Sequence, residues 1–467
     1  MKKLAILAVL ACMVFGFAAS ASAVELDAKG QFQFQMNLID NADFLGEKDG
    51  GNSDDDLNFW FRARTEFRFI ANENLWAVLY TEYKNRVGNG HTNESASDND
   101  SGLYVKRAYL QYRFPGTEVL TSAGILSVNL PGAVTGNMVL GDADLGTFMV
   151  ETPITDEIAL AGAFIRHTDR LEDDGANNLR DELDIFYAAV PVTLDGISAT
   201  PYFAYSVIGD RAVATGRTVQ GFSGPVGSVQ TKNANAWWLG TSFSMDMFDP
   251  IVFAADIVYG SVDADAKDND RSGLLVDASV AYTGLDFVQP KVLFAYSTGE
   301  DDKTDNGSER LPVVSNDWAL GNSFYFGGTD LTGTDADLDN AEQLGFWALG
   351  LSLDDISFFE KLTHRLTFMY VQGTNDKDLI KNQGAAIAAG NNFIQADGNF
   401  LTTEDHVFAI DFNTNYQIYD ELAAIAEFGY ADVDLDKGTW ENSGVNGRLK
   451  TKQDPCLKFA VGLVYKF

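Results

Sequence analysis

The chain ends in a twelve-residue stretch of strictly alternating polarity, and this pattern limits the folds it can adopt. Successive side chains of a β-strand point to opposite faces, so one face of this strand is apolar and the other mixes small residues with Lys458 and Lys466. Such an edge would promote aggregation of a soluble sheet, whereas a closed barrel in a membrane has no free edge and gives one face to lipid. The apolar face comprises Leu457, Phe459, Val461, Leu463, Tyr465 and Phe467.

The same two-residue period recurs in earlier segments. Between residues 26 and 39, Phe32 and Phe34 face one way while Gln31 and Gln33 face the other. Residues 57–71, 182–187 and 408–416 repeat the pattern. No apolar run after position 23 approaches the roughly 18 residues that a membrane helix needs. Strands of about 10 to 13 residues with this alternation fit a tilted crossing of the hydrocarbon layer, so we predict an all-β transmembrane antiparallel barrel.

Short and long connections alternate along the chain, and they predict the number of strands. Eight short turns lie near residues 72–74, 115–117, 153–156, 193–196, 246–250, 284–290, 354–362 and 418–421. Nine long polar loops lie near residues 40–56, 87–102, 128–144, 168–181, 209–234, 263–271, 300–343, 375–404 and 434–455. This order predicts eighteen strands with both termini on one side, short periplasmic turns and long external loops. Merging two weak strands would give sixteen.

The first 23 residues have the layout of a secretory signal peptide. An apolar run, residues 4–19, follows two lysines, and residues 21–23 form a small-x-small cleavage site. Cleavage before Val24 would leave residues 24–467 as the barrel, and a lipoprotein signal centred on Cys12 is the alternative. Cys456 would then be the only cysteine of the mature chain, so we expect no internal disulfide.

The formal net charge of −34 argues against nucleic acid as a partner, because phosphate backbones bind basic surfaces. The acidic residues cluster in Asp-, Asn- and Gly-rich segments at 49–56, 263–270, 300–305 and 330–339. These segments are typical of solvated loops, and divalent ions could bridge some of them to lipopolysaccharide. Residues 432–438 resemble a calcium loop but lack Gly at the sixth position and Glu at the twelfth, so we expect a solvated turn. No cofactor or metal site is predicted.

Histidine placement gives little support to an enzyme. None of the four histidines lies in a Ser-centred nucleophile motif or a His-Glu-x-x-His helix. We therefore expect no catalytic activity. The four are His91, His167, His364 and His406.

Taken together, the signal peptide, the amphipathic strands and the terminal Phe467 make the mature chain resemble the trimeric porins of Gram-negative outer membranes, including those of sulfate-reducing bacteria. Segment 128–144, which is apolar and contains Pro and Gly, follows the fifth strand, where the third external loop of these porins folds into the lumen. The resemblance implies an inward-folded third loop and a homotrimer that contacts outer-membrane lipid and lipopolysaccharide. It also implies a C-terminal insertion signal for the barrel assembly machinery, formed by Leu463, Tyr465 and Phe467.

Arginines on the polar faces of two segments mark the expected constriction. An arginine in lipid near mid-membrane costs roughly 2–4 kcal/mol, so these side chains should face the lumen. We expect them to form a basic wall opposed by the third-loop carboxylates Asp142 and Asp144, which would create a field across the lumen. Alternatively, they pair with Glu66, Glu82 and nearby acids and only fill the lumen. The basic wall comprises Arg62, Arg64, Arg68, Arg107 and Arg113.

Three functions fit such a barrel. The first is a passive channel for small hydrophilic solutes and ions, with weak anion preference or none. The second is a solute-specific channel, in which an arginine ladder binds oxyanions or an aromatic track guides sugars. The third is a structural or adhesive barrel whose lumen is closed by loop 300–343. The aromatic track would comprise Trp60, Trp76, Tyr80 and Tyr109, which could instead pack at the membrane interface or in the lumen.

Overall fold

The computed structural model describes most of the chain after residue 23. The described residues are 24–42, 44, 56–86, 103–168, 182–209, 233–265, 267–303, 305–315, 317–331, 344–390, 394, 400–441 and 453–467. The predicted signal peptide therefore lies outside the described residues, as do the central parts of several predicted external loops.

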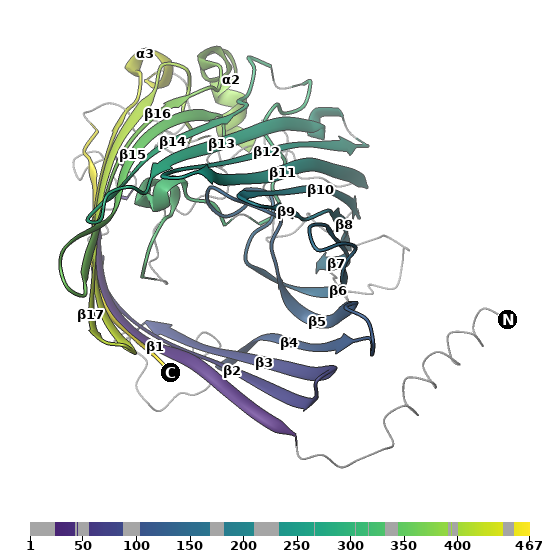
Figure 1. Cartoon of the computed structure of the whole chain (residues 1–467). Coiled ribbons are helices and arrows are strands. Elements are labelled where there is room, and N and C mark those ends of the chain that lie inside the picture. The colour runs from purple at the N-terminus through teal and green to yellow at the C-terminus, as the bar shows by residue number, and fades with distance from the viewer. Residues whose placement is uncertain are drawn as a thin grey trace, which may run out of the picture.

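The described strands form one closed antiparallel β-barrel (Figure 1). β1 (Glu25–Asp40) pairs with β2 (Asp56–Asn72) on one side and with β19 (Cys456–Lys466) on the other, which closes the ring. β8 (Leu183–Ala189) and β9 (Val192–Leu194) both pair with β10 (Ile197–Ile208), so together they are one interrupted barrel strand. The nineteen strand segments thus make eighteen barrel strands, and the predicted number is confirmed.

The remaining strands follow one another around the ring in chain order. They are β3 (Leu75–Arg86), β4 (Leu103–Arg113), β5 (Leu120–Val128), β6 (Ala143–Pro153), β7 (Ala159–Thr168), β11 (Ala234–Phe248), β12 (Ile251–Ala264), β13 (Arg271–Tyr282), β14 (Gln289–Ser297), β15 (Phe346–Phe359), β16 (Leu362–Gly373), β17 (His406–Tyr419) and β18 (Leu422–Asp434).

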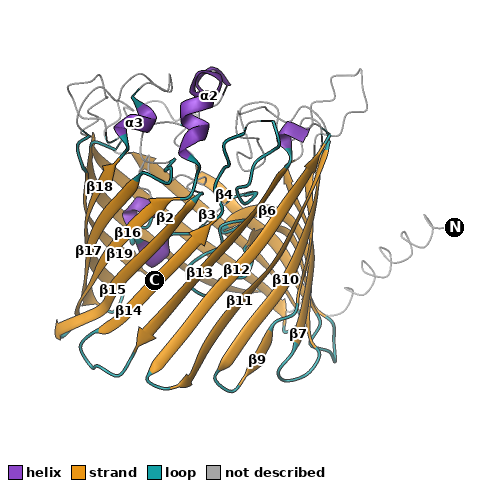
Figure 2. Cartoon of the chain, turned by 90° about the horizontal axis from the view of Figure 1, so that it is seen from above, coloured by secondary structure: helices purple, strands orange, loops and turns teal. Residues whose placement is uncertain are grey.

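Turns and loops lie at opposite ends of the barrel (Figure 2). The turn between β2 and β3 spans only residues 73–74, whereas 48 residues, 298–345, separate β14 from β15. Helices α2 (Lys377–Gly390) and α3 (Lys437–Trp440) belong to the loop end, and η3 (Lys267–Asn269), η4 (Leu320–Asn322) and η5 (Phe324–Phe326) are single 3-10 turns in loops. Among the described residues, no helix has both the length and the apolar character to span a membrane.

The burial pattern of the barrel is the inverse of that of a soluble sheet. On β1, Phe32 and Phe34 are 43% and 44% exposed, whereas the alternating Gln33 and Gln35 are 3% and 1% exposed. Burying apolar side chains drives folding in water, so this inversion makes sense only where lipid covers the outer face. The outer face carries many large apolar side chains, whereas the lumen receives amides, hydroxyls and charges.

The C-terminal residues complete the ring at its turn end. Gly30 and Phe467 exchange two main-chain hydrogen bonds of 2.9 and 3.0 Å. The Phe467 ring stacks on Phe32 with 5.8 Å between centroids, and Tyr465 stacks on Phe467 at 6.1 Å. Leu463, like these two aromatics, is on the outer face, 46% exposed. The three residues of the predicted insertion signal therefore form part of the lipid-facing surface.

Two loops fold into the barrel and determine the shape of its lumen. The third loop (residues 129–142) connects β5 to β6, and the seventh loop (residues 298–345, of which 298–303, 305–315, 317–331 and 344–345 are described) connects β14 to β15. They bond to each other, since Val314 N–H donates to Val139 O at 2.8 Å and Gly141 N–H to Ser315 O at 2.7 Å. A Cβ at Gly136 would lie only 1.4 Å from the Asp317 carbonyl oxygen, so this close approach requires glycine.

Candidate functional site

The predicted basic wall starts on neighbouring strands β2 and β3. Arg62 is opposite Lys84, and Arg64 is opposite Glu82. Oε2 of Glu82 accepts hydrogen bonds from Nε of Arg62 at 2.6 Å and from Nε of Arg64 at 2.5 Å. One carboxylate thus holds two guanidinium groups in place and offsets part of the repulsion between Arg62 and Lys84. The remaining charge of this group is positive.

Arg107 of β4 joins the basic wall through the predicted third-loop acids. Its Nε donates to Asp144 at 2.5 Å and its Nη2 to Asp142 at 2.9 Å. Lys106 also lies 3.2 Å from Asp144, because a bulge between β3 and β4 adds a residue here. Asp142 and Asp144 are therefore placed directly on the basic side chains of β4, at the point where the third loop enters β6.

The other predicted lumen residues are spread along the wall. Glu66 pairs with Lys29 of β1 at 3.1 Å. Arg68 is near the turn end, with its guanidinium 4.9 Å from the centre of the Trp76 ring. Arg113 is at the last position of β4, where its nearest acid, Glu118 of the following turn, is 3.9 Å away. The structure thus brings Arg62, Arg64 and Glu82 into one contact group, whereas Arg68 and Arg113 are apart from it.

Three of the four aromatic residues of the predicted track, Trp60, Trp76 and Tyr80, lie against basic side chains. Nζ of Lys84 lies 4.8 Å from the centre of the Trp60 ring, and the Arg107 guanidinium lies 5.2 Å from that of Tyr80. Such contacts are worth about 0.5–1 kcal/mol at exposed sites and more where water is excluded. In addition, Trp76 Nε1–H donates to Gln111 at 2.6 Å. These aromatics therefore orient the basic side chains.

The third loop is fastened to the opposite wall by a carboxylate. Asp256 of β12 accepts main-chain N–H groups of Ala133 and Val134, all at 2.8 Å. Asp277 is directly opposite Asp256 on β13. Hydrogen bonds to a charged acceptor are each worth about 1.5–3 kcal/mol, so this contact holds the loop against the wall. The inward-folded third loop that the resemblance implied is confirmed.

Carboxylates also fasten the seventh loop. Asp277 accepts Trp318 Nε1–H at 2.5 Å. Asp411 of β17 accepts the Ser323 hydroxyl at 2.6 Å and the Phe324 N–H at 2.8 Å. The loop therefore follows the inner faces of β13 to β17, where its aromatic residues are buried.

A further anchor of the seventh loop is Glu427 of β18. It accepts the main-chain N–H groups of Asp330 and Leu331, the latter at 2.8 Å, and the Thr329 hydroxyl at 3.0 Å. It also forms an ion pair with Lys458 of β19 at 2.8 Å, and both side chains are almost fully buried. A buried ion pair of this kind is stable only when its remaining donors and acceptors form hydrogen bonds. Here the seventh loop donates them.

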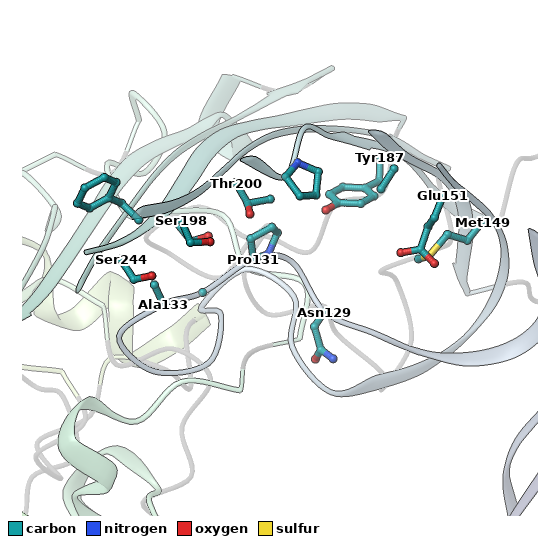
Figure 3. Close-up of a pocket in the computed structure, with 14 residues that line it drawn as sticks. Asn129, Pro131, Ala133, Met149, Glu151, Tyr187, Ser198, Thr200 and Ser244 are labelled. Carbon is teal, nitrogen blue, oxygen red and sulfur yellow. The ribbon is translucent and has the colours of Figure 1, made fainter. Parts of the chain in front are cut away.

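A recess lies beside the third loop, near the short-turn ends of β6, β10 and β11. Its volume is about 480 Å³, and residues 129–133 of the third loop form one side (Figure 3). Ser198 is opposite Ser244, and Thr200 is opposite Ser242, so four hydroxyls lie on adjacent positions of one inner face. Tyr187, Glu151 and Asn129 of the third loop complete the polar lining. This recess and the basic wall are two separate polar surfaces of the lumen.

Sequence reasoning did not recognise the loop anchors. The signal in the sequence was an acidic residue at an inward position of an alternating strand. It is present at Asp256, Asp277, Asp411 and Glu427. The loop partner of Asp411 is 87 residues away in the chain, and that of Asp256 is 123 residues away. No local pattern therefore connects an anchor with its loop.

The suspected calcium loop has a structural explanation. Asp436 caps α3, because its Oδ2 accepts the Thr439 N–H at 2.8 Å and the Thr439 hydroxyl at 2.6 Å. These bonds hold the pKa of Asp436 below its usual value. Among the described residues, no group of three or more His, Cys, Asp and Glu side chains could hold a metal ion.

Comparisons with known proteins identify the fold. No protein-family model matches the chain, and no curated protein sequence matches it. Three solved structures from Pseudomonas aeruginosa are similar to it along nearly their whole length. OccK11 (OpdR) is 10% identical over 95% of this chain and 96% of its own, with a TM-score of 0.52. OccK8 (OprE) is 12% identical over 94% and 98%, with a TM-score of 0.51. The outer membrane protein OprD is 10% identical over 94% of each chain, with a TM-score of 0.52.

Proposed function

We propose that this chain is a porin, a passive water-filled channel through which small hydrophilic solutes and ions cross the outer membrane of a Gram-negative bacterium. The observation that carries the proposal is the inverted burial of a closed barrel, with phenylalanines outside and amides and charges inside. Only a membrane barrel satisfies both faces. The similarity in fold to an outer membrane protein supports the location.

The basic wall supports a weak anion preference. Arg62 and Arg64 share one acid, Glu82, and Lys84 is opposite Arg62, so the local charge is positive although the whole chain is acidic. External loop charges are screened over about 8 Å at physiological salt, whereas charges in the lumen act directly on a passing ion. An anion is therefore favoured where the lumen is basic.

Reversal potential in a planar bilayer under a salt gradient tests this function. We expect discrete conductance steps from the wild-type protein, and a shift toward cations in the variant Arg62→Ala/Arg64→Ala/Arg68→Ala. Arg166→Ala is the matched control, because Arg166 pairs with Asp184 on β7 and β8, outside the basic wall. Steps with unchanged selectivity would remove the basic wall from the constriction. The absence of steps from folded protein would instead support a structural barrel.

A solute-specific channel is the second candidate. The third loop is fastened to the wall by the partly buried Asp256 and the seventh loop by the buried Asp411 and Glu427, which restricts the lumen to defined surfaces. In a general diffusion channel, solutes should pass according to size alone, whereas a specific channel shows saturable block by its solute.

Assembly and export complete the proposal. We propose a homotrimer, as expected from the resemblance of the sequence to trimeric porins, and mass measurement of the protein in detergent tests it. Residues 1–23 are proposed as a signal peptide, to be tested by N-terminal sequencing of exported protein. The outer-face residues Leu463, Tyr465 and Phe467 are proposed to address the chain to the barrel assembly machinery, and removal of Phe467 should lower the yield of inserted protein. Lipopolysaccharide remains the proposed partner of the external loops, and catalysis is not part of the proposal.

A further inference from the structure

The recess beside the third loop has the composition of a binding site for a neutral solute. Four hydroxyls, on Ser198, Thr200, Ser242 and Ser244, line it together with the Tyr187 hydroxyl and the Glu151 carboxylate. Within the part of the chain that the structure describes, none of these six side chains forms a hydrogen bond or ion pair with another protein group. Their donors and acceptors are therefore free to bind a molecule in the recess.

The strands fix the spacing of the four hydroxyl-bearing residues. Directly opposed residues on one face of an antiparallel pair have Cβ atoms about 4.5–5.5 Å apart, and residues two apart along a strand are separated by about 6.8 Å. Ser198, Ser244, Thr200 and Ser242 therefore mark the corners of a small rectangle on β10 and β11. A sugar ring carries hydroxyls around a comparable outline. Because both strands belong to the closed sheet, this arrangement exists before the solute arrives.

The size and charge of the recess narrow the solute class. A cavity of about 480 Å³ is within the range of about 300–1,000 Å³ typical of small-molecule sites. Glu151 contributes the only formal charge of the lining, so an anion would meet repulsion there. A carboxylate accepts hydrogen bonds from hydroxyl groups, and serine and threonine hydroxyls both donate and accept. Neutral polyhydroxylated molecules match this set.

We propose that the recess is a binding subsite for a neutral sugar or polyol on its way through the channel. The third loop, held by Asp256, closes one side of the subsite with Pro131 and Ala133 (Figure 3). The opposite basic surface on β2 to β4 is a separate region that acts on charged solutes. The inference rests on the proposed channel function and names its solute class.

Sugar block of the ion current tests the subsite. Glucose and sucrose are titrated against single channels of the whole protein in a planar bilayer, and polyethylene glycol of matching hydrodynamic size is the control. We expect saturable block by a sugar and none of comparable affinity by the polymer. In Ser242→Ala/Ser244→Ala the half-blocking concentration should rise about tenfold, because two neutral hydrogen bonds to the sugar are lost.

Three further variants keep the result interpretable. Thr200→Val should weaken the block, whereas Thr200→Ser should retain it, because serine keeps the hydroxyl of threonine and valine lacks it. Ser279→Ala is the matched control, since Ser279 is on the inner face of β13 outside the recess. Equal block in all variants, no block by either sugar, or equal block by the polymer would overturn the subsite. A wild-type protein that does not conduct would overturn the channel function itself, which is a different outcome.

Discussion

The two halves of the barrel wall treat their inward charges differently. On β2 to β4, basic side chains pair with acids of β3 and β6, and the guanidinium groups stay at the lumen surface. On β12 to β18, acids accept N–H groups from the inward loops and become covered by them. A carboxylate paired within the wall sets the local charge, whereas one paired with a loop sets the width of the lumen. The first half should therefore determine ion preference and the second half the conductance.

The strongest test of this comparison is Glu427→Ala, in the loop-covered half. The substitution leaves Lys458 as a buried unpaired charge and frees Thr329, Asp330 and Leu331. Breaking a buried pair from one side costs about 3–5 kcal/mol, so we expect a loss of this order in the free energy of unfolding, measured by urea titration in lipid vesicles. Conductance should also become larger and noisier.

A matched control and a double variant separate charge from packing. Glu421→Ala removes a carboxylate from the turn before β18 and should change neither property. Glu427→Ala/Lys458→Met removes both charges and should recover most of the lost stability, because no unpaired charge remains. If the single and double variants were equally unstable, the ion pair would not be the source of the effect.

Asp256→Ala tests the anchor of the third loop. The carboxylate accepts two main-chain N–H groups of that loop, and charged hydrogen bonds are worth about 1.5–3 kcal/mol each in stability. Water can replace part of this interaction in the lumen, so we expect a smaller loss of stability than for Glu427 and more open-channel noise. Asp263→Ala, at the exposed end of the same strand, is the control. Quiet single channels in Asp256→Ala would show that the loop is held by its other contacts.

Glu82→Gln tests the other half of the comparison. Glutamine keeps the shape of the side chain but removes the charge that Arg62 and Arg64 share, so the basic wall gains one positive charge. In a hydrated lumen such a change is worth on the order of 0.5–1 kcal/mol, or roughly a two- to fivefold rise in the anion-to-cation permeability ratio. Glu73→Gln, in the short turn after β2, is the control. A changed conductance with unchanged selectivity would contradict the division between the two halves.

The same comparison explains what the sequence could predict. Strand alternation depends on neighbouring residues, so Phe32, Phe34 and the glutamines between them indicated the barrel, and the turns indicated eighteen strands. The contact of Arg62 and Arg64 with Glu82 joins adjacent strands, and the sequence offered it as one of two alternatives.

The loop-covered half could not be derived in this way. The contact between Ala133 and Asp256 joins residues 123 positions apart, and it depends on how the third loop turns inside a closed ring. The recess depends on the relative stagger of β10 and β11, which places Ser198 opposite Ser244. Both are properties of the assembled barrel, so only the structure shows them.

The smallest expected effect is a pH dependence of the seventh loop. Partial burial, with the nearby carboxylates Glu300 and Asp301, raises the pKa of Glu309 from its ordinary value of 4.5 to about 7. A raised pKa means that the folded loop binds a proton more tightly than the unfolded chain does. The stabilising contribution is therefore complete below about pH 4.5 and is lost as the pH rises through 7. Hydrogen exchange of residues 305–310, corrected for intrinsic rates, should be faster at pH 8 than at pH 5.

Glu309→Gln should remove this dependence, because glutamine cannot lose a proton. The Asp301 N–H donates to Glu309 at 3.1 Å, and the amide oxygen of glutamine can still accept it. Asp305→Asn, at an exposed position of the same loop, is the matched control and should leave the dependence unchanged. A dependence that persisted in Glu309→Gln would assign the proton to another group. Loss of the pH dependence in Glu309→Gln would identify Glu309 as a titratable contact of the loop-covered half. A small change in pH would then alter loop mobility, while the ion preference set by β2 to β4 stayed constant.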